Sequence, residues 1–312
     1  MKIVFMGTPD FAEKSLEDVY NAGHEILAVV TNPDRPKGRG MKMVASPVKE
    51  FAVSKNLKIY QPEKVRKNVE FIEEIKKLEP DVICVVAYGK ILPKEILEIP
   101  KLGCINVHGS LLPKYRGAAP IQWAVINGEK VTGVTTMYMD VGMDTGDMIL
   151  KEKTEIAPDE TTGELWDRLA KIGADLLVKT LEQIENKTAP RIPQGEDFSM
   201  APMLDKEMSK IDWESKTAQE IKNLVRGLNP IMGTYAYLNG KKIKIWKVDV
   251  VEADNENVKN GTVLKSDSKD GLYIKAKDGV IKVLEIQGEN AKRMNIQDFL
   301  RGNQIEVGSI FE

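Results

Sequence analysis

Two polar side chains that could do chemistry stand at the end of one apolar run. Asn106 and His108 close the segment 104–108 (CINVH), and Gly109 follows directly. Because side chains alternate along a β-strand, Asn106 and His108 should lie on the same side of it. An amide donor beside an imidazole can hold a developing oxyanion and move a proton. The pair therefore indicates a reacting site at the end of a strand.

A carboxylate that could complete this arrangement lies further along the chain, at Asp144. It belongs to the loop 140–147 (DVGMDTGD), in which two glycines permit sharp turns. If the fold brings this loop back, Asp144 can orient His108 as in a catalytic triad. No covalent nucleophile is evident beside them, so acyl transfer or hydrolysis is the indicated chemistry. A calcium loop is an alternative, but the order of the acidic residues does not match the helix–loop–helix pattern. A solvated loop is another, and Asp140 can be a structural cap or a ligand contact.

The first half of the chain alternates apolar strand-like runs with amphipathic helical patterns. We expect strands over 2–6, 25–31, 81–87 and 104–108, and a helix over 63–79. This alternation predicts an α/β fold with a doubly wound, mostly parallel sheet, whose ligands bind at the carboxyl ends of the strands. His108 lies at such an end. The turn after the first strand lacks the dinucleotide and phosphate-loop fingerprints, so no nucleotide cofactor is expected.

In the second half of the chain, the composition and the pattern of expected helices and strands change. A long helix is expected over 161–185, and a segment rich in Pro, Gly and polar residues follows it. Short β runs then recur between Asn-Gly and Asp-Gly turns, which is typical of a small antiparallel barrel. We therefore expect a catalytic domain over 1–188, a linker over 189–206 and a smaller β domain over 207–312. The expected strands of that domain cover 234–238, 243–250, 261–264, 271–275 and 280–286.

Composition indicates a soluble globular protein. The chain has 312 residues, of which 42% are hydrophobic and 29% charged. No apolar run is long enough to span a membrane, and the first residues already form a strand pattern, so we expect no signal peptide and a cytoplasmic location. Cys84 and Cys104 lie in apolar runs and are expected to be buried, not paired. His24 follows a Gly in a turn and receives no role.

A basic segment is a candidate for contact with phosphate. The net charge of −2 argues against nucleic-acid binding driven by overall charge, so any such contact needs a local patch. The segment 32–42 follows the second strand, and its composition predicts a mobile loop with Pro and Gly. Such loops are usually only solvated surface. Its four cations are Arg35, Lys37, Arg39 and Lys42. Their expected place, on the same rim as His108, favours a large substrate that carries phosphates.

Taken together, these motifs resemble the folate-dependent formyltransferases. The resemblance rests on Asn106-x-His108, on 110–117 (SLLPKYRG) and on the loop 140–147, and it extends to 6–11 (MGTPDF) and 86–89 (VAYG). It implies a formyltransferase-like catalytic domain and an OB-like C-terminal barrel. It also implies that Asn106, His108 and Asp144 are catalytic.

The same resemblance implies the substrates. The formyl donor would be 10-formyltetrahydrofolate, used without a metal, and the acceptor would be the amino group of methionyl initiator tRNA in translation initiation. The folate site would include Ser110, Leu111, Leu112 and Pro113. The basic segment would match an inserted loop that grips the acceptor stem. The enzyme is expected to act as a monomer.

Three other functions stay open from the sequence. A formyltransferase acting on a sugar-nucleotide amine would share the catalytic residues, although the basic segment speaks against it. If the protein were a formyltetrahydrofolate hydrolase, the basic segment and the barrel would have no evident function. A non-catalytic RNA-binding protein would leave the Asn, His and Asp residues unexplained.

Overall fold

The computed structural model describes residues 1–37, 41–252 and 258–312, and these fall into two compact units. The first unit is made of Met1–Pro120, Val131–Glu155 and Trp166–Pro202. The second is made of Ile121–Lys130, Ile156–Leu165 and Met203–Glu312. None of the described helices combines the length and the apolar character needed to cross a membrane.

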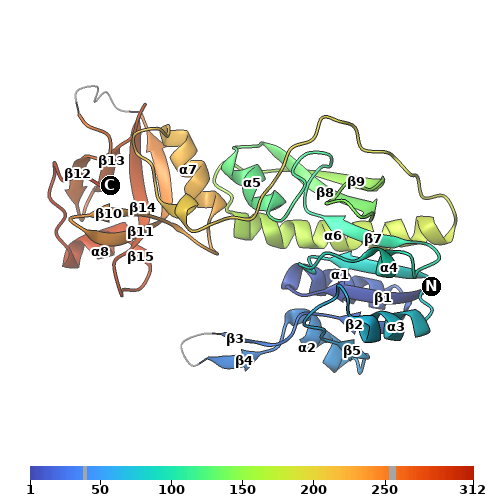
Figure 1. The fold of residues 1–312 in the computed structure, drawn as a ribbon. Helices are drawn as coiled ribbons and strands as arrows, with labels where there is room; N and C mark the ends of the chain where they lie inside the picture. The colour runs from blue at the N-terminus through green and yellow to red at the C-terminus, as the bar shows by residue number, and fades with distance from the viewer. Residues whose placement is uncertain (38–40, 253–257) are drawn as a thin grey trace. The chain divides into compact units, whose positions relative to one another are not determined.

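A seven-stranded sheet forms the centre of the first unit (Figure 1). Its strands, in spatial order, are β5 (Ile59–Tyr60), β2 (Glu25–Val30), β1 (Lys2–Gly7), β6 (Val82–Val86), β7 (Cys104–His108), β8 (Val131–Tyr138) and β9 (Met148–Glu155). The pairs from β5 to β7 are parallel, and β8 and β9 add antiparallel strands beyond β7. The expected doubly wound, mostly parallel sheet is therefore confirmed.

Helices pack on both faces of this sheet. On one face, α3 (Val69–Lys77) and α4 (Lys94–Leu97) form a core with alternate residues of β1 and β6. On the other face, α1 (Asp10–Asn21), α2 (Pro47–Ser54) and α6 (Thr162–Glu185) pack against the sheet and one another. With both faces covered, β6 is buried at every position, as its uniform apolar sequence predicts. Cys84 and Cys104 are buried and unpaired, as expected.

The carboxyl ends of the parallel strands meet at one edge of the sheet. His108 is the last residue of β7, so its side chain lies at this edge, and β2 ends at the same edge with Val30. Between β2 and β7 lie three strand spacings, or about 14 Å. The segments that follow β2 and β7 can therefore meet different parts of one large ligand.

Two expectations from the sequence were wrong in detail. The helix expected over 63–79 begins only at Val69, because Lys67 has a φ of +59° and the Asn68 side chain caps the helix by accepting from the Phe71 N–H. The basic segment is not an irregular loop. It forms an antiparallel hairpin of β3 (Arg35–Lys37) and β4 (Lys42–Val44), which projects from the sheet in Figure 1. Pro36 is tolerated there because the two-stranded hairpin has free edges.

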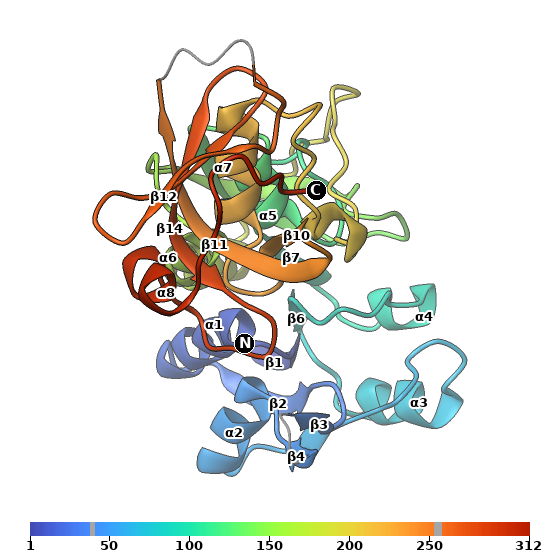
Figure 2. The ribbon, with the colours of Figure 1, turned by 90° about the vertical axis from the view of Figure 1, so that its left-hand side faces the viewer.

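The second unit contains an antiparallel sheet (Figure 2). Its strands, in spatial order, are β10 (Thr234–Leu238), β11 (Lys241–Val251), β14 (Val280–Gln287), β13 (Gly271–Lys275) and β12 (Val263–Asp267), with β15 (Met294–Asn295) also paired to β14. A short 3₁₀ turn (Glu207–Ser209) precedes the sheet, α7 (Ala218–Gly227) packs on β11, and α8 (Ile296–Gly302) packs on β13 and β14.

The C-terminal residues form backbone hydrogen bonds with β10 and with β12, the first and last strands in this spatial order. Glu312 and Tyr237 of β10 exchange two backbone bonds of 2.7 and 2.8 Å, and the Val263 N–H of β12 donates to the Ser309 carbonyl over 2.8 Å. Because one short segment reaches both β10 and β12, the sheet must curl until its edges approach. This curled sheet agrees with the expected OB-like architecture, although in the described chain no direct pairing joins β10 to β12.

The second unit also includes two segments from the middle of the sequence. Segment 121–130 carries most of α5 (Pro120–Ile126), and segment 156–165 carries the start of α6. The Arg226 guanidinium of α7 is 8% exposed and donates to the carbonyls of Ala157 and Glu160, while Thr162 Oγ1 donates to the Gly227 carbonyl over 2.7 Å. Burial lowers the pKa of Arg226. Whether 1–188 and 207–312 fold separately stays a prediction.

Candidate active site

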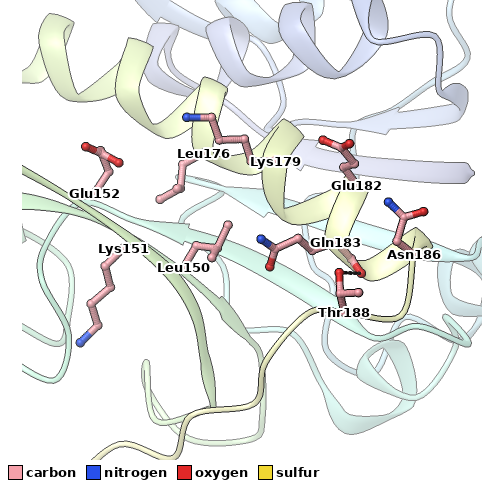
Figure 3. Close-up of a pocket in the computed structure, with 9 residues that line it drawn as sticks. All are labelled: Leu150, Lys151, Glu152, Leu176, Lys179, Glu182, Gln183, Asn186 and Thr188. Atoms are coloured by element: carbon pink, nitrogen blue, oxygen red, sulfur yellow. Dashed lines mark hydrogen bonds between the residues drawn. The ribbon is translucent and has the colours of Figure 1, made fainter.

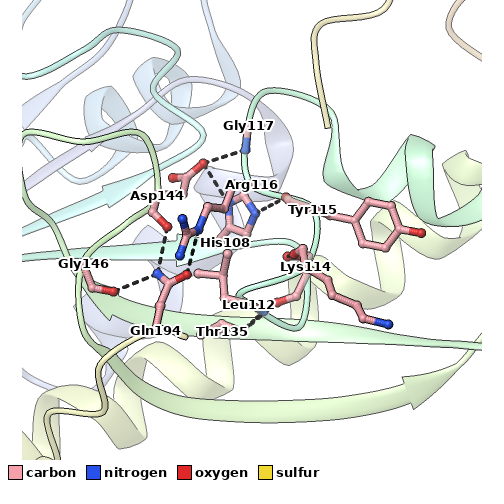
Figure 4. A network of polar contacts seen from close by, with 11 residues as sticks. His108, Leu112, Lys114, Tyr115, Arg116, Gly117, Thr135, Asp144, Gly146 and Gln194 are labelled. Carbon is pink, nitrogen blue, oxygen red and sulfur yellow. Dashed lines mark hydrogen bonds and ion pairs between the residues drawn. The ribbon is translucent and has the colours of Figure 1, made fainter. Parts of the chain in front are cut away.

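His108 and Asp144 lie side by side at the edge of the first sheet (Figure 4). The distance from His108 Nδ1 to Asp144 Oδ2 is 3.7 Å, and the two side chains are 6% and 18% exposed. The same carboxylate oxygen accepts from the Gly117 N–H over 2.9 Å. The fold therefore brings together an imidazole and a carboxylate that are far apart in the sequence.

The other ring nitrogen of His108 is held by the backbone. His108 Nε2 lies 2.8 Å from the carbonyl oxygen of Tyr115. A carbonyl oxygen only accepts hydrogen bonds, so Nε2 carries the proton and Nδ1 keeps the lone pair in the neutral ring. The Tyr115 carbonyl thus orients the imidazole, and Asp144 faces the basic nitrogen.

Asn106 lies two residues before His108 on β7 and on the same side of the strand. Its side chain is half-buried, and its amide has no hydrogen-bond partner among the described residues. A half-buried donor without a partner beside an imidazole can donate to an oxygen of a bound molecule.

The loop that carries Asp144 is braced from within. Asp140 Oδ1 accepts from the Gly142 N–H over 2.9 Å and from Thr145 Oγ1 over 2.6 Å, so Asp140 caps its own loop. Asp144 has a φ of +54°, in the left-handed region that costs free energy for any residue with a Cβ. Among the residues that the structure describes, no group of three or more His, Cys, Asp or Glu side chains is arranged to hold a metal ion.

The segment 110–113 follows β7 and turns back over β8. Ser110 is fully buried and donates to the Lys114 carbonyl, and the Leu112 N–H donates to Oγ1 of Thr135 on β8 over 3.1 Å. Leu112 is 1% exposed, whereas Leu111 and Pro113 are half-buried. Ser110 and Leu112 therefore shape this segment from inside, and the other two can meet a ligand with their side chains.

The β3–β4 hairpin presents exposed cations and is fastened at its base. Arg35 and Lys42 are exposed, while Arg39 lies outside the described residues. At the base, the Lys49 amine lies 2.6 Å from the Asp34 carboxylate and, with a hydrogen bond from Gln61, lowers the pKa of Asp34.

Lys90 is a further cation near the hairpin, and it was not among the site residues expected from the sequence. Burial and then the charge of Arg35 lower the pKa of the Lys90 amine. The Lys90 amine itself donates to the carbonyls of Pro62 and Glu63, over 2.5 and 3.0 Å. For Lys37 the structure gives the backbone position only, in β3.

Sequence reasoning missed the contribution of residues 192–201, which we call the strap. They were expected to be linker, yet Ile192 pairs with Met148 of β9 through two backbone hydrogen bonds of 2.9 and 3.0 Å. The Ser199 hydroxyl accepts from the Tyr115 N–H, and Gln194 contacts the loop of Asp144. Apart from its composition, which suggests a linker, the sequence carries no signal for these contacts.

A separate hollow lies between β9 and α6 (Figure 3). Its charged lining residues are Lys151, Glu152, Lys179 and Glu182, two of each sign. The Lys151 amine donates to the Leu112 carbonyl, so it supports the segment 110–113 from behind. The hollow contains none of the expected site residues.

Comparison with known proteins gives the class. The family described as Formyl transferase matches residues 1–181, and the one described as Formyl transferase, C-terminal domain matches residues 203–304. The chain therefore belongs to the formyl transferase family. Within it, the chain is 52% identical over 311 residues to a methionyl-tRNA formyltransferase of Acetivibrio thermocellus and 54% identical over 311 residues to that of Clostridioides difficile. Each alignment covers 99% of this chain and 99% of the relative.

Solved structures share the fold at much lower identity. HypX from Aquifex aeolicus in complex with tetrahydrofolic acid has a TM-score of 0.66 at 16% identity, over 99% of this chain and 50% of that chain. An N-formyltransferase from Helicobacter canadensis, in complex with folinic acid and dTDP-3-aminofucose, has a TM-score of 0.65 at 21% identity, over 94% of this chain and 100% of that chain. At these identities the likeness supports the fold alone.

Proposed function

We propose that this protein transfers a formyl group from 10-formyltetrahydrofolate to the α-amino group of methionyl initiator tRNA. The observation that carries the proposal is the approach of the Asp144 carboxylate to within 3.7 Å of His108 at the end of β7, with Asn106 two residues earlier on the same strand. Full-length identity of about half to methionyl-tRNA formyltransferases supports the choice of acceptor. Since that acceptor serves translation initiation, we expect the reaction in the cytoplasm. We also expect a monomer.

The reaction begins when the amine of the methionyl group attacks the formyl carbon. A new C–N bond forms, and the carbonyl electron pair moves to oxygen to give a tetrahedral oxyanion. We assign the Asn106 amide as the donor to that oxyanion, because it is half-buried and has no partner among the described side chains. No metal is required for this step.

His108 then moves the proton. Its Nδ1 lone pair accepts the proton from the attacking nitrogen, while the Tyr115 carbonyl keeps Nε2–H in place. The Asp144 carboxylate, 3.7 Å from Nδ1, stabilises the imidazolium that results. His108 returns the proton to the folate nitrogen as its bond to the formyl carbon breaks. The products are formylmethionyl-tRNA and tetrahydrofolate.

Replacing Asn106 by alanine should lower kcat about tenfold to a hundredfold, less than the loss of a donor in a fully enclosed oxyanion hole, because Asn106 is half-buried. The affinity for the folate should change little, since the oxyanion exists only after the attack. Steady-state kinetics and folate titration of the variant measure both. Equal losses of kcat and folate affinity would instead make Asn106 a ground-state contact.

For the folate we propose a place beside the segment 110–113. Leu111 and Pro113 are half-buried and offer an apolar wall to a pterin ring. The buried Ser110 and Leu112 hold the shape of that wall, so their role is indirect.

For the tRNA we propose that the β3–β4 hairpin contacts phosphates through Arg35, Lys37, Arg39 and Lys42. The double change Arg35→Ala, Lys42→Ala should weaken productive use of the tRNA by about 1–3 kcal/mol, the scale of charged hydrogen bonds. Folate affinity should be unchanged. The salt dependence of tRNA binding should also become less steep, because fewer counterions are released.

Lys101→Ala is the matched control for the hairpin. Lys101 is also an exposed cation, but it precedes β7 at the opposite edge of the sheet. If the hairpin variant and this control have the same salt slope and kinetics as the wild type, the hairpin makes no contact with the tRNA.

The function is tested by following the label from a formyl-labelled donor. The protein is incubated with charged initiator tRNA, with a sugar-nucleotide amine, or with buffer alone. We expect label in the tRNA-linked methionine. Label in the sugar would support a sugar N-formyltransferase, and free labelled formate in buffer would support a hydrolase.

A further inference from the structure

Gln194 of the strap contacts the backbone of Asp144 and the side chain of Arg116, which follows the residue whose carbonyl holds His108. Its side-chain NH₂ donates to the carbonyls of Asp144 and Gly146, each over 2.8 Å, and its Oε1 accepts from Arg116 Nε over 2.9 Å (Figure 4). All three polar positions of the amide group are engaged with good hydrogen-bond distances. The side chain therefore joins the loop 140–147 to the segment after β7.

Arg116 is flanked in the chain by the two residues whose backbone atoms hold His108 and Asp144. Tyr115 holds His108 through its carbonyl, and Gly117 holds Asp144 through its N–H. Arg116 stands between these two backbone contacts and is 8% exposed, with its guanidinium carbon 4.6 Å from the centre of the Phe198 ring. The backbone of Arg116 is paired with Ser199 and Ala201 of the strap over 2.8 and 2.7 Å, and Gln194 adds a side-chain contact to this stretch, from which both His108 and Asp144 are held.

The hydrogen bond from Gln194 to the Asp144 carbonyl is made where the backbone has an unfavourable conformation. With a φ of +54°, Asp144 is in a conformation that its loop must impose. The loop is mostly exposed, and the exceptions are Asp144, Asp147 and the buried Gly146. Two hydrogen bonds from Gln194 to the carbonyls of Asp144 and Gly146 hold the turn on both sides, so that the carboxylate faces Nδ1 of His108.

We propose that Gln194 is a positioning residue, which keeps the Asp144 carboxylate against His108 and makes the strap part of the active site. The inference rests on the proposed roles of His108 and Asp144. Gln194 itself does not contact the reacting atoms. Loss of its two donors should let the loop relax and move the carboxylate away from the imidazole.

The first test needs no substrate. The chain has only two histidines, so the ring nitrogen signals of ¹⁵N-histidine protein can be assigned by comparison with His108→Ala. At a fixed pH, the His108 signals of Gln194→Ala should move toward those of Asp144→Asn. The His24 signals should stay in place. Glu196→Ala, an exposed position on the same strap, should leave both histidines as in the wild type.

A second variant separates the contacts if Gln194→Ala unfolds. Gln194→Glu keeps the shape and the acceptor for Arg116, but it replaces the two donors by a carboxylate oxygen that faces two carbonyls. It should move the His108 signals in the same direction as Gln194→Ala. If His108 keeps its wild-type signals in these variants, Gln194 does not position Asp144 and the inference is overturned.

The kinetic test is a double-mutant cycle with Asp144→Asn. Gln194→Ala should lower kcat of the wild type by up to about a hundredfold, the cost of a small misplacement of a catalytic group, with KM for both substrates nearly unchanged. In the Asp144→Asn background the same change should lower kcat less than about threefold, because the carboxylate is already absent. A full loss in both backgrounds would show a merely structural role. If the wild type does not formylate tRNA at all, the proposed function fails, while the histidine signals still decide whether Gln194 positions Asp144.

Discussion

Replacing His108 by alanine is expected to lower kcat for formyl transfer by about 10²–10⁴-fold, the range for the loss of a general acid–base group. His108 is buried and its ring is fixed by the Tyr115 carbonyl, so the alanine variant lacks a proton carrier that is held in one orientation. Folate affinity should change little, because proton transfer contributes in the transition state. Rapid-quench measurement of the transfer step, together with folate titration, gives both quantities.

His24→Ala is the control for this change. His24 lies at the other end of the sheet, where its Nδ1 is 3.4 Å from the amino group of Met1, and burial lowers its pKa. Its replacement should leave the transfer rate within about twofold of the wild type, as for a surface change away from the site. A His108→Ala protein with near-normal turnover would remove the assignment of His108 as the proton carrier.

Changing Asp144 to asparagine is expected to lower kcat by about 10²–10³-fold, below the loss seen when the aspartate of a serine-protease triad is changed. The new amide oxygen can still accept from the Gly117 N–H, so the loop keeps this contact. The negative charge 3.7 Å from Nδ1 is lost, however, and the imidazolium is no longer stabilised. The expected defect is therefore in kcat, with the affinity for both substrates retained.

Asp147→Asn in the same loop provides the comparison. Asp147 lies 3.6 Å from Arg191 in a largely exposed ion pair, a kind of contact that contributes little to stability. Its variant should behave as the wild type. If Asp144→Asn and Asp147→Asn are equally active, the carboxylate beside His108 has no part in the reaction.

The parts of the site that the sequence predicted are those with a local signature. The strand over 104–108 ends where the structure ends β7, because an apolar run followed by His and Gly marks a buried strand and its exit. The loop of Asp144 was recognisable by its glycines and acidic residues. Its closure onto His108 was a hypothesis from the family motifs, and in the structure the two side chains are neighbours.

The parts that the sequence did not predict depend on backbone atoms and on distant segments. His108 and Asp144 are held by the Tyr115 carbonyl and the Gly117 N–H. Every residue other than proline has both backbone groups, so the residue types at these positions do not indicate these contacts. Gln194 lies in a segment without hydrophobic periodicity, and its partners lie far away in the chain. The composition of the strap resembles that of a linker because its order comes from contacts with the catalytic loops rather than from a core of its own.

The hairpin after β2 was mistaken for a loop for a similar reason. Its strands have three residues each, too few for an alternating pattern to be detected, and the first of them contains a proline. Its direction is set at the base by Asp34, Lys49 and Gln61, whose side chains meet only after folding. The charge of the segment was nevertheless visible in the sequence.

The most direct test of the account is one incubation of the wild-type protein with formyl-labelled donor and equal amounts of methionyl initiator and methionyl elongator tRNA. After the two tRNAs are separated and their esters are hydrolysed, the account predicts label in N-formylmethionine from the initiator tRNA, with tetrahydrofolate formed in equal amount. Label released as free formate, or no label on the methionine of either tRNA, would contradict it.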